Sequence, residues 1–116
     1  MQLRHKNRLI YFQEQSECTR KYVIPYLEKI LPIKPNLRIL EIGCGEGGNL
    51  QPFLEIGCLC VGVDIDVAQL EKAKQYLFDY SLFVKFAVCN LNVYRGRHYL
   101  YKTVLHFHHS IRQILS

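Results

Sequence analysis

RILEIGCGEGGNL, residues 38–50, joins a short apolar run to four glycines within six positions. A short apolar run that ends at glycines is typical of a buried strand. Glycine loses more conformational freedom on folding than any other residue, so four together need a structural reason. The reason that we infer is a loop whose backbone comes close to a ligand.

Apolar periodicity on both sides of this loop predicts alternating strands and helices. We expect strands over residues 37–42, 58–65 and 82–88, and helices over residues 49–56 and from residue 66 onward. This alternation is typical of an α/β fold with a parallel sheet. Each crossover between parallel strands is expected to be right-handed.

Individual residues predict where these helices begin and end. Pro52 is expected in a first helical turn, and Gly57 is expected to stop that helix. Asp66 is expected to cap the next helix, with Gln69 at the position of a capping-box partner. The largely apolar stripe expected along that helix consists of Val67, Leu70, Ala73, Lys74 and Leu77.

The two ends of the chain carry weaker signals. Residues 7–31 are expected to be helical in two pieces, with Pro25 in a first turn or at a kink. The prolines in LPIKPN, residues 31–36, forbid a continuous helix into the first strand. Further on, YLYKTVLHF (residues 99–107) is compatible with a fourth strand, and IRQILS (residues 111–116) with the start of a helix.

Composition places the chain among globular proteins. Its 116 residues are enough for one domain, and 49% of them are hydrophobic and 22% charged. No apolar run approaches the roughly 20 residues that span a bilayer, and the N-terminus lacks the apolar core of a signal peptide. We therefore expect a soluble, cytoplasmic protein without a membrane partner. Five cysteines without a C-x-x-C pair favour reduced, buried thiols over a disulfide or a metal site.

The net charge of +5 is unevenly distributed along the chain. Residues 1–79 hold ten basic and ten acidic residues, whereas residues 80–116 hold five basic residues and no acid. This basic tail leaves RNA or another anionic partner open. The tail lacks the dense Lys/Arg clusters and interleaved aromatic platform of most nucleic-acid surfaces, so nucleic acid is the less favoured partner.

Two acids indicate which ligand suits the loop. Residues 43–48 satisfy G-x-G-x-x-G, and Asp64 follows Gly43 by 21 residues, as in a dinucleotide-binding unit. Glu41 lies two residues before the loop, where its carboxylate would repel a pyrophosphate and attract a cation. A ligand with a sulfonium, an amino group and a ribose diol would use both acids. Glu41 would help to hold its amino-acid end, through water or the loop, and Asp64 would accept from both ribose hydroxyls.

The stretch ILEIGCGEGGNLQPFLEIGCLCVGVDIDVAQLEKAK, residues 39–74, closely resembles the first motifs of class I S-adenosylmethionine-dependent methyltransferases. The resemblance implies an α/β, Rossmann-like parallel sheet with helices on both faces and an N-terminal helical segment. It also implies S-adenosyl-L-methionine as cofactor and methyl transfer as the reaction. The cofactor-binding residues that follow from it are Glu41, Gly43, Cys44, Gly45, Gly47, Asp64, Ile65, Asn90 and Leu91.

The resemblance also implies how the adenine is held. Ile65 would stack beside the ring. The side-chain oxygen of Asn90 would accept a hydrogen bond from the adenine amino group, where family members usually have an acid. The backbone of Leu91 would lie next to the ring, and Asn92 is the alternative to Asn90.

We interpret the whole chain, residues 1–116, as one methyltransferase-like domain with three parts. Residues 1–36 form an N-terminal helical lid segment, and residues 37–92 form the cofactor-binding βαβαβ core. Residues 93–116 form a basic tail with the fourth strand and the start of a helix. Within the lid segment, Tyr11 and Phe12 are candidates for covering the cofactor, with ordinary helix packing as the alternative for both.

Members of this family generally have a seven-stranded sheet, whereas this chain supplies three strands and a candidate fourth. The C-terminal strands of the family, which carry much of the substrate site, are therefore predicted to be missing. We interpret the chain as a truncated or incomplete member. A fragment, a degenerate member and a chain with a foreign, frameshifted tail are the three alternatives behind that interpretation.

No catalytic residue is assigned from the sequence. On a strand, His106 and His108 would share a face, and His106 or His109 is a candidate base beside the methyl group. No Cys, Asp or Glu follows these histidines to complete a metal shell, so no metal site is predicted. The methyl donor is already activated, so the protein is expected to supply mainly positioning and desolvation.

The sequence therefore predicts an S-adenosylmethionine-dependent methyltransferase that acts on a small molecule. The acceptor and the methylated atom stay open. The first alternative is a non-catalytic or truncated cofactor-binding module that acts through partners, and it predicts self-association through an exposed sheet edge. An NAD-dependent oxidoreductase is the less favoured enzyme, because Glu41 would oppose a pyrophosphate.

Overall fold

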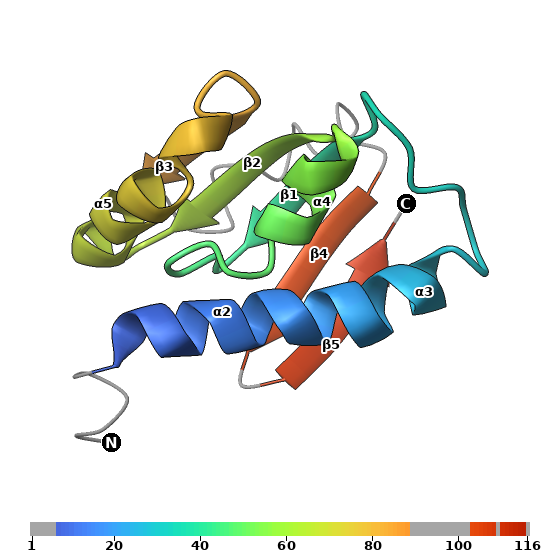
Figure 1. Cartoon of the computed structure of the whole chain (residues 1–116), viewed down its shortest axis with the longest axis horizontal. Coiled ribbons are helices and arrows are strands. Elements are labelled where there is room, and N and C mark those ends of the chain that lie inside the picture. Colours follow the sequence, from blue (N-terminus) through green and yellow to red (C-terminus); the bar gives the residue numbers. More distant parts are fainter. Residues whose placement is uncertain (1–6, 89–102, 109, 116) are drawn as a thin grey trace.

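The computed structural model describes residues 7–88, 103–108 and 110–115, and its centre is a five-stranded sheet (Figure 1). The strand order is β3-β2-β1-β4-β5. β1 runs parallel to β2 and to β4, β2 runs parallel to β3, and β5 is antiparallel to β4. The strands are β1 Arg38–Ile42, β2 Leu59–Asp64, β3 Val84–Val88, β4 Thr103–His108 and β5 Ser110–Leu115. The three strands expected from the sequence are confirmed.

Three helical segments follow one another in the chain before β1. They are α2 Arg8–Cys18, the π-helical η1 Thr19–Val23 and α3 Ile24–Leu27. Pro25 lies in the first turn of α3, as one of the two expectations for it required. Because proline has no backbone N–H, the regular hydrogen-bond ladder cannot continue through it, and the helix type changes just before this residue.

The remaining helices connect the parallel strands, and they confirm most of the boundary signals. α4 spans Gln51–Ile56, α5 spans Val67–Tyr76, and the short 3₁₀ helix η2 spans Phe78–Tyr80. Pro52 lies in the first turn of α4, and Gly57 ends that helix in the left-handed conformation at φ 108°.

The start of α5 confirms the cap and corrects the capping box. The Asp66 side chain accepts hydrogen bonds from the backbone N–H groups of Ala68 and Gln69, as a cap should. The Gln69 side chain reaches the Asp66 carboxylate and not the Asp66 backbone. In a capping box, the Gln69 side chain would accept a hydrogen bond from the backbone N–H of Asp66. That N–H instead donates to the Asp64 carboxylate at 2.9 Å, so the second hydrogen bond of the box does not form.

The buried stripe of α5 is narrower than expected. Leu70, Ala73 and Leu77 are buried, in agreement with the helical period. Val67, by contrast, is 53% exposed, and Lys74 is exposed with its ammonium near Glu71. Both lie on the solvent side of the helix, so their inclusion in the stripe was wrong.

The described helices all cover the same face of the sheet (Figure 1). Successive right-handed crossovers from β1 to β2 and from β2 to β3 move in one direction, so they place α4 and α5 on one side. α2 packs beside α4 there. The core on this face includes Phe12, Ile39, Leu50, Phe53, Cys60, Leu70 and Leu77.

The second face of the sheet carries a smaller apolar cluster. It is formed by Leu40 and Val63, against which Ile42, Val61 and Ala87 pack, and all of these belong to strands. Within the described residues, helices therefore lie on one face only, and no described helix covers the face that carries this smaller cluster. The Rossmann-like arrangement itself is confirmed by the parallel β3-β2-β1-β4 order.

The C-terminal part of the described chain departs from the expectation. A fourth strand is present as β4, but the segment expected to start a helix forms β5, antiparallel to β4. A helix of six residues is too short to be stable alone, whereas pairing with β4 gives the same backbone a hydrogen-bonded partner. No helix in the described ranges has the length and apolar character needed to span a bilayer.

Candidate functional site

The glycine loop, residues 43–48, lies at the carboxyl ends of β1 and β2. The parallel register pairs Ile42 with Val63, so both strands end at the same level. The backbone N–H groups of Gly43 and Cys44 both donate to the carbonyl of Val63, at 2.8 Å and 3.0 Å. The loop is therefore fixed against the end of β2. This is the edge at which open α/β sheets bind their ligands.

Gly45 and Gly47 are required by the path of the backbone and by the approach of α5. Their φ angles are 56° and 87°, in the left-handed region that L side chains rarely adopt. A Cβ at Gly45 would lie 2.8 Å from the Gln69 side chain, and one at Gly47 would lie 2.9 Å from Leu77. At Gly47, where the Cβ of Ala73 would also lie 3.4 Å away, close packing of α5 is thus a second reason for glycine, besides the approach of a ligand that the sequence suggested. At Gly45 the neighbour is the movable end of Gln69, so the backbone conformation is the main reason.

Asp64 ends β2 with its carboxylate held by backbone donors. One oxygen accepts from the N–H of Gly45 at 2.8 Å, and the other accepts from the N–H of Asp66 at 2.9 Å. Each carboxylate oxygen has two lone pairs, so each can accept a further hydrogen bond. The side chain is only half-buried and is therefore an oriented acceptor beside the loop.

Glu41 lies on β1 and is completely buried. Its Oε2 accepts a hydrogen bond from the Asn49 amide at 3.1 Å, whereas its Oε1 has no partner among the described residues. Burial raises the pKa of the Glu41 carboxyl to about 8; the charge of Asp64 adds to the increase, and the Asn49 hydrogen bond opposes it. An isolated buried carboxylate oxygen is costly, so this atom suits a ligand that brings a donor.

The N-terminal helical segment is attached to the loop by polar contacts that the sequence did not reveal. The Ser16 hydroxyl donates to the Gly48 carbonyl at 2.7 Å, and the Thr19 hydroxyl donates to the Asn49 side chain at 2.7 Å. Ser16 and Thr19 are both buried. With Phe12 and Val23 they occupy one helical stripe, and that spacing is the signal that would have found them.

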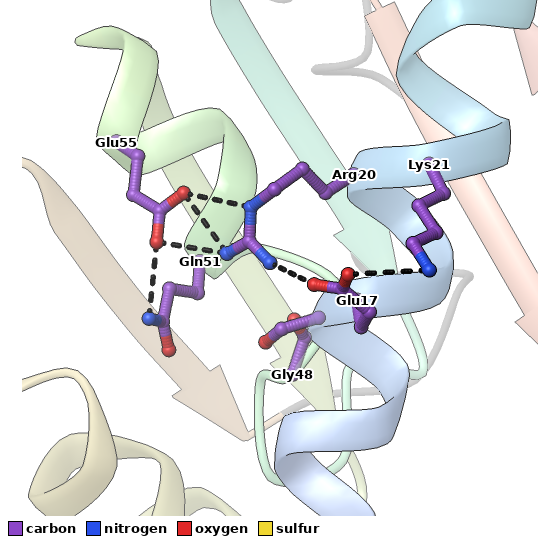
Figure 2. A network of polar contacts seen from close by, with 7 residues as sticks. Glu17, Arg20, Lys21, Gly48, Gln51 and Glu55 are labelled. Atoms are coloured by element: carbon purple, nitrogen blue, oxygen red, sulfur yellow. Dashed lines mark hydrogen bonds and ion pairs between the residues drawn. The ribbon is translucent and has the colours of Figure 1, made fainter.

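Ion pairs on the surface add to this attachment. Arg8 contacts Glu46 of the loop at 2.7 Å. Arg20 of η1 contacts both oxygens of Glu55 on α4, and it also contacts Glu17 (Figure 2). Each exposed pair contributes little alone, so the buried hydroxyl contacts define the docking of the segment.

Two further predicted site residues and candidates, Phe12 and Cys44, have a clear place in the structure. Phe12 is buried and its ring lies 4.9 Å from that of Tyr76, centroid to centroid, which agrees with ordinary helix packing and not with a lid. The side chain of Cys44 is buried, and a Cβ at Gly62 would lie 2.7 Å from its sulfur. The Cys44 side chain therefore packs against β2. Only the backbone of this residue is left for contact with a ligand.

Other predicted residues lie at the edge or outside the description. Ile65 is 77% exposed directly after Asp64, so its apolar surface is available beside the loop. Tyr11 is partly buried on α2. Asn90, Leu91, Asn92 and His109 lie outside the described residues, and of His106 and His108 the structure describes only the backbone in β4.

Residues 12–113 match the family model described as Methyltransferase domain. The chain belongs to this methyltransferase family. The match covers the glycine loop, Asp64 and the strands on both sides, so the resemblance inferred from residues 39–74 is confirmed at the level of the family.

Curated relatives match a shorter part of the chain. The chain is 41% identical over 61 residues to the ubiquinone biosynthesis O-methyltransferase of Bartonella tribocorum, and this covers 47% of the chain and 25% of the relative. It is 37% identical over 51 residues to the enzyme of the same name from Bartonella quintana, covering 44% of the chain and 21% of the relative. The chain thus spans about a quarter of the length of these relatives.

Solved structures support the fold. Magnesium protoporphyrin IX methyltransferase from Synechocystis PCC 6803, with bound SAM, matches 79% of this chain and 44% of its own, with a TM-score of 0.62 and 23% identity. An RNA methyltransferase from Salinibacter ruber, in complex with S-adenosyl-L-homocysteine, matches 72% of this chain and 56% of its own, with a TM-score of 0.58 and 16% identity. At these identities the likeness concerns the fold alone.

Proposed function

We propose that this chain binds S-adenosyl-L-methionine and forms the cofactor half of a methyltransferase. The observation that carries the proposal is the Oε1 of the buried Glu41, beside the glycine loop, for which the described residues supply no hydrogen-bond partner. A ligand that brings a cationic, hydrogen-bonding group would satisfy this atom. The amino-acid end of S-adenosylmethionine is such a group, and family membership supports the assignment.

The adenosine end of the cofactor fits the end of β2. Asp64 is oriented by two backbone donors and keeps lone pairs for the two ribose hydroxyls. Ile65 is exposed beside it, and Val88, opposite Asp64 in the register of β2 and β3, is 54% exposed. These two apolar side chains offer a surface for the adenine.

The reaction that we propose is transfer of the sulfonium-bound methyl group to a small-molecule acceptor. The chain's part in this reaction is to fix the cofactor through Glu41 and Asp64, because positioning is a large share of catalysis in such displacements. Two curated relatives are named as O-methyltransferases of ubiquinone biosynthesis, which supports a small molecule over a nucleic acid. We place the protein in the cytoplasm.

Calorimetric titration with S-adenosylhomocysteine and, separately, with NADH tests this proposal. Above pH 8, where Glu41 is ionised, we expect saturable binding of S-adenosylhomocysteine and none of NADH, because a carboxylate beside the glycine loop would repel a pyrophosphate. Binding of NADH alone would overturn the proposal in favour of an oxidoreductase.

A second candidate is a cofactor-binding module that acts through partners without catalysing transfer itself. The observation that favours it is that the described sheet has two edge strands, β3 and β5. This candidate predicts self-association through the edge of β3, one of the two outermost strands of the described sheet. Sedimentation of the purified chain with and without S-adenosylhomocysteine tests it, and a monomer with tight cofactor affinity would contradict it.

A further inference from the structure

Three buried polar side chains connect the N-terminal helical segment to β1. The Thr19 hydroxyl of η1 donates to Asn49 Oδ1 at 2.7 Å, and Asn49 Nδ2 donates to Glu41 Oε2 at 3.1 Å. Their exposed fractions are 1% for Thr19, 8% for Asn49 and 0% for Glu41. We call this series the Thr19 relay; it crosses from η1 through the loop to the first strand.

The direction of the relay follows from what each group can do. A carboxylate only accepts hydrogen bonds, so Asn49 must present its nitrogen to Glu41 when that group is ionised. The Asn49 oxygen then faces Thr19, whose hydroxyl is free to donate. With the amide reversed, the Asn49 oxygen would face a Glu41 oxygen, and two acceptors would repel each other. The ionised Glu41 carboxylate thus sets the amide orientation, and the Thr19 hydroxyl stabilises that orientation by donating to the Asn49 oxygen.

The relay uses one Glu41 oxygen and leaves the other for a ligand. Within the described part of the chain, the titratable groups that influence Glu41 or are influenced by it are Asp64, Cys44 and Cys60, and none is a cation. Among the described residues, therefore, no basic side chain balances the charge of this carboxylate and no group donates a hydrogen bond to its Oε1. A cationic donor from the ligand would supply both.

The relay exists only while the helical segment is docked. Thr19 is the first residue of the π-helical η1, and such insertions often occur at functional sites. The neighbouring contacts that hold the segment are Ser16 to the Gly48 carbonyl and Arg20 to Glu55 (Figure 2). If the segment moves away, Asn49 loses the hydrogen bond from Thr19 that stabilises its side chain beside Glu41.

We propose that Thr19 and Asn49 are positioning residues that fix the Glu41 carboxylate for the amino group of the cofactor. The helical segment then controls cofactor affinity through a hydroxyl that touches no part of the cofactor. This inference rests on the proposed function, since it names the cofactor that Glu41 holds. The inference goes beyond the proposed function because it assigns part of the cofactor affinity to Thr19, 22 positions before Glu41 in the chain.

The test compares two ligands on three variants of the full 116-residue chain. S-adenosylhomocysteine carries the amino-acid end, whereas 5′-methylthioadenosine has the same adenine and ribose without it. We expect Thr19→Val to weaken S-adenosylhomocysteine about tenfold and to leave 5′-methylthioadenosine unchanged, because one hydrogen bond behind a charged group is lost. Thr19→Ser keeps the hydroxyl and should restore the affinity. Ser16→Ala is the matched control, because it removes a buried helix-to-loop hydrogen bond outside the relay.

A measurement on the unmodified chain covers the case in which Thr19→Val does not fold. The carbon-13 signal of the Glu41 carboxyl should move when S-adenosylhomocysteine is added and stay in place with 5′-methylthioadenosine. The inference is overturned if Thr19→Val weakens both ligands equally or neither, or if the Glu41 signal responds to both alike. If the unmodified chain binds neither ligand, the proposed function itself fails. If the unmodified chain binds both ligands and the variants leave the ratio of the two affinities unchanged, only this inference fails.

Discussion

The ends of β1 and β2 place the same chemical group in two different surroundings. At the end of β2, Asp64 is half-buried and its two oxygens accept from backbone N–H groups. On β1, Glu41 is fully buried, has one side-chain donor and leaves one oxygen without a described partner. Under the proposed function, the carboxylate of Asp64 would accept from neutral ribose hydroxyls, whereas that of Glu41 would pair with the charged amino group of the cofactor.

The largest expected effect is on stability, and it follows from the burial of Glu41. Its pKa is raised from 4.5 to about 8, so between these values the unfolded chain is ionised at this position while the folded chain keeps the proton. The folded state then binds more protons, and the free energy of unfolding falls as pH rises from 4.5 to 8, by at most about 4 kcal/mol. Glu41→Gln removes this contribution. Urea unfolding of both proteins across this range measures it, and parallel pH profiles would contradict the assignment.

The next largest effect is expected on the affinity for ligands, which should distinguish Glu41 on β1 from Asp64 at the end of β2. Glu41→Gln preserves the shape of the side chain and its acceptor for Asn49, but removes the charge. We expect S-adenosylhomocysteine to bind about 30-fold more weakly or worse, because a buried charge partner is lost, and 5′-methylthioadenosine to bind as before. Calorimetry measures both constants. An equal loss for the two ligands would mean that Glu41 acts on the loop and not on the amino group.

The matching change at the end of β2 should not discriminate between the ligands. Asp64→Asn weakens the acceptor for the ribose hydroxyls, so both ligands should bind about tenfold more weakly. Competition with a fluorescent adenosine analogue measures this loss. A variant that retains full affinity for 5′-methylthioadenosine would show that Asp64 serves only to hold the loop through Gly45.

The smallest effect is expected within the loop itself. Gly47→Ala places a side chain at φ 87°, with its Cβ 2.9 Å from Leu77. We expect a loss of about 1–2 kcal/mol in the free energy of unfolding from the left-handed backbone alone. Ser81→Ala, at an exposed turn, is the control. Unchanged stability of Gly47→Ala would mean that the loop can relax away from α5.

Much of the fold could be predicted because local signals limit each element. The first strand was expected over residues 37–42 and is observed as Arg38–Ile42, since a proline-containing connector and glycines bound it. Gly57 and Asp66 ended and began their helices as expected. Such signals act over a few residues and are visible in the sequence.

The missed features depend on contacts between distant residues. Asn49 was expected to begin a helix, but α4 begins at Gln51, and the Asn49 side chain contacts Thr19, 30 residues earlier. The capping box failed because Asp64 occupies the backbone N–H of Asp66. The expected C-terminal helix is a strand because β4 offers it a pairing partner. No local propensity contains this information.

The two acids illustrate the same limit within the site. Their positions and their preference for a cationic, ribose-bearing ligand were predicted from spacing alone. The structure adds that Asn49 donates to one oxygen of Glu41, whereas no described residue donates to the other. The proposed preference for a charged donor rests on this detail.

The most direct test is the pH dependence of affinity of the unmodified chain for two ligands. Glu41 must give up its proton to receive a cation, and its pKa is about 8 in the free protein. Between pH 6 and 7.5, the association constant of S-adenosylhomocysteine should rise by about tenfold per pH unit, while that of 5′-methylthioadenosine stays constant. Equal pH profiles for the two ligands would contradict the claim that the buried Glu41 binds the amino-acid end.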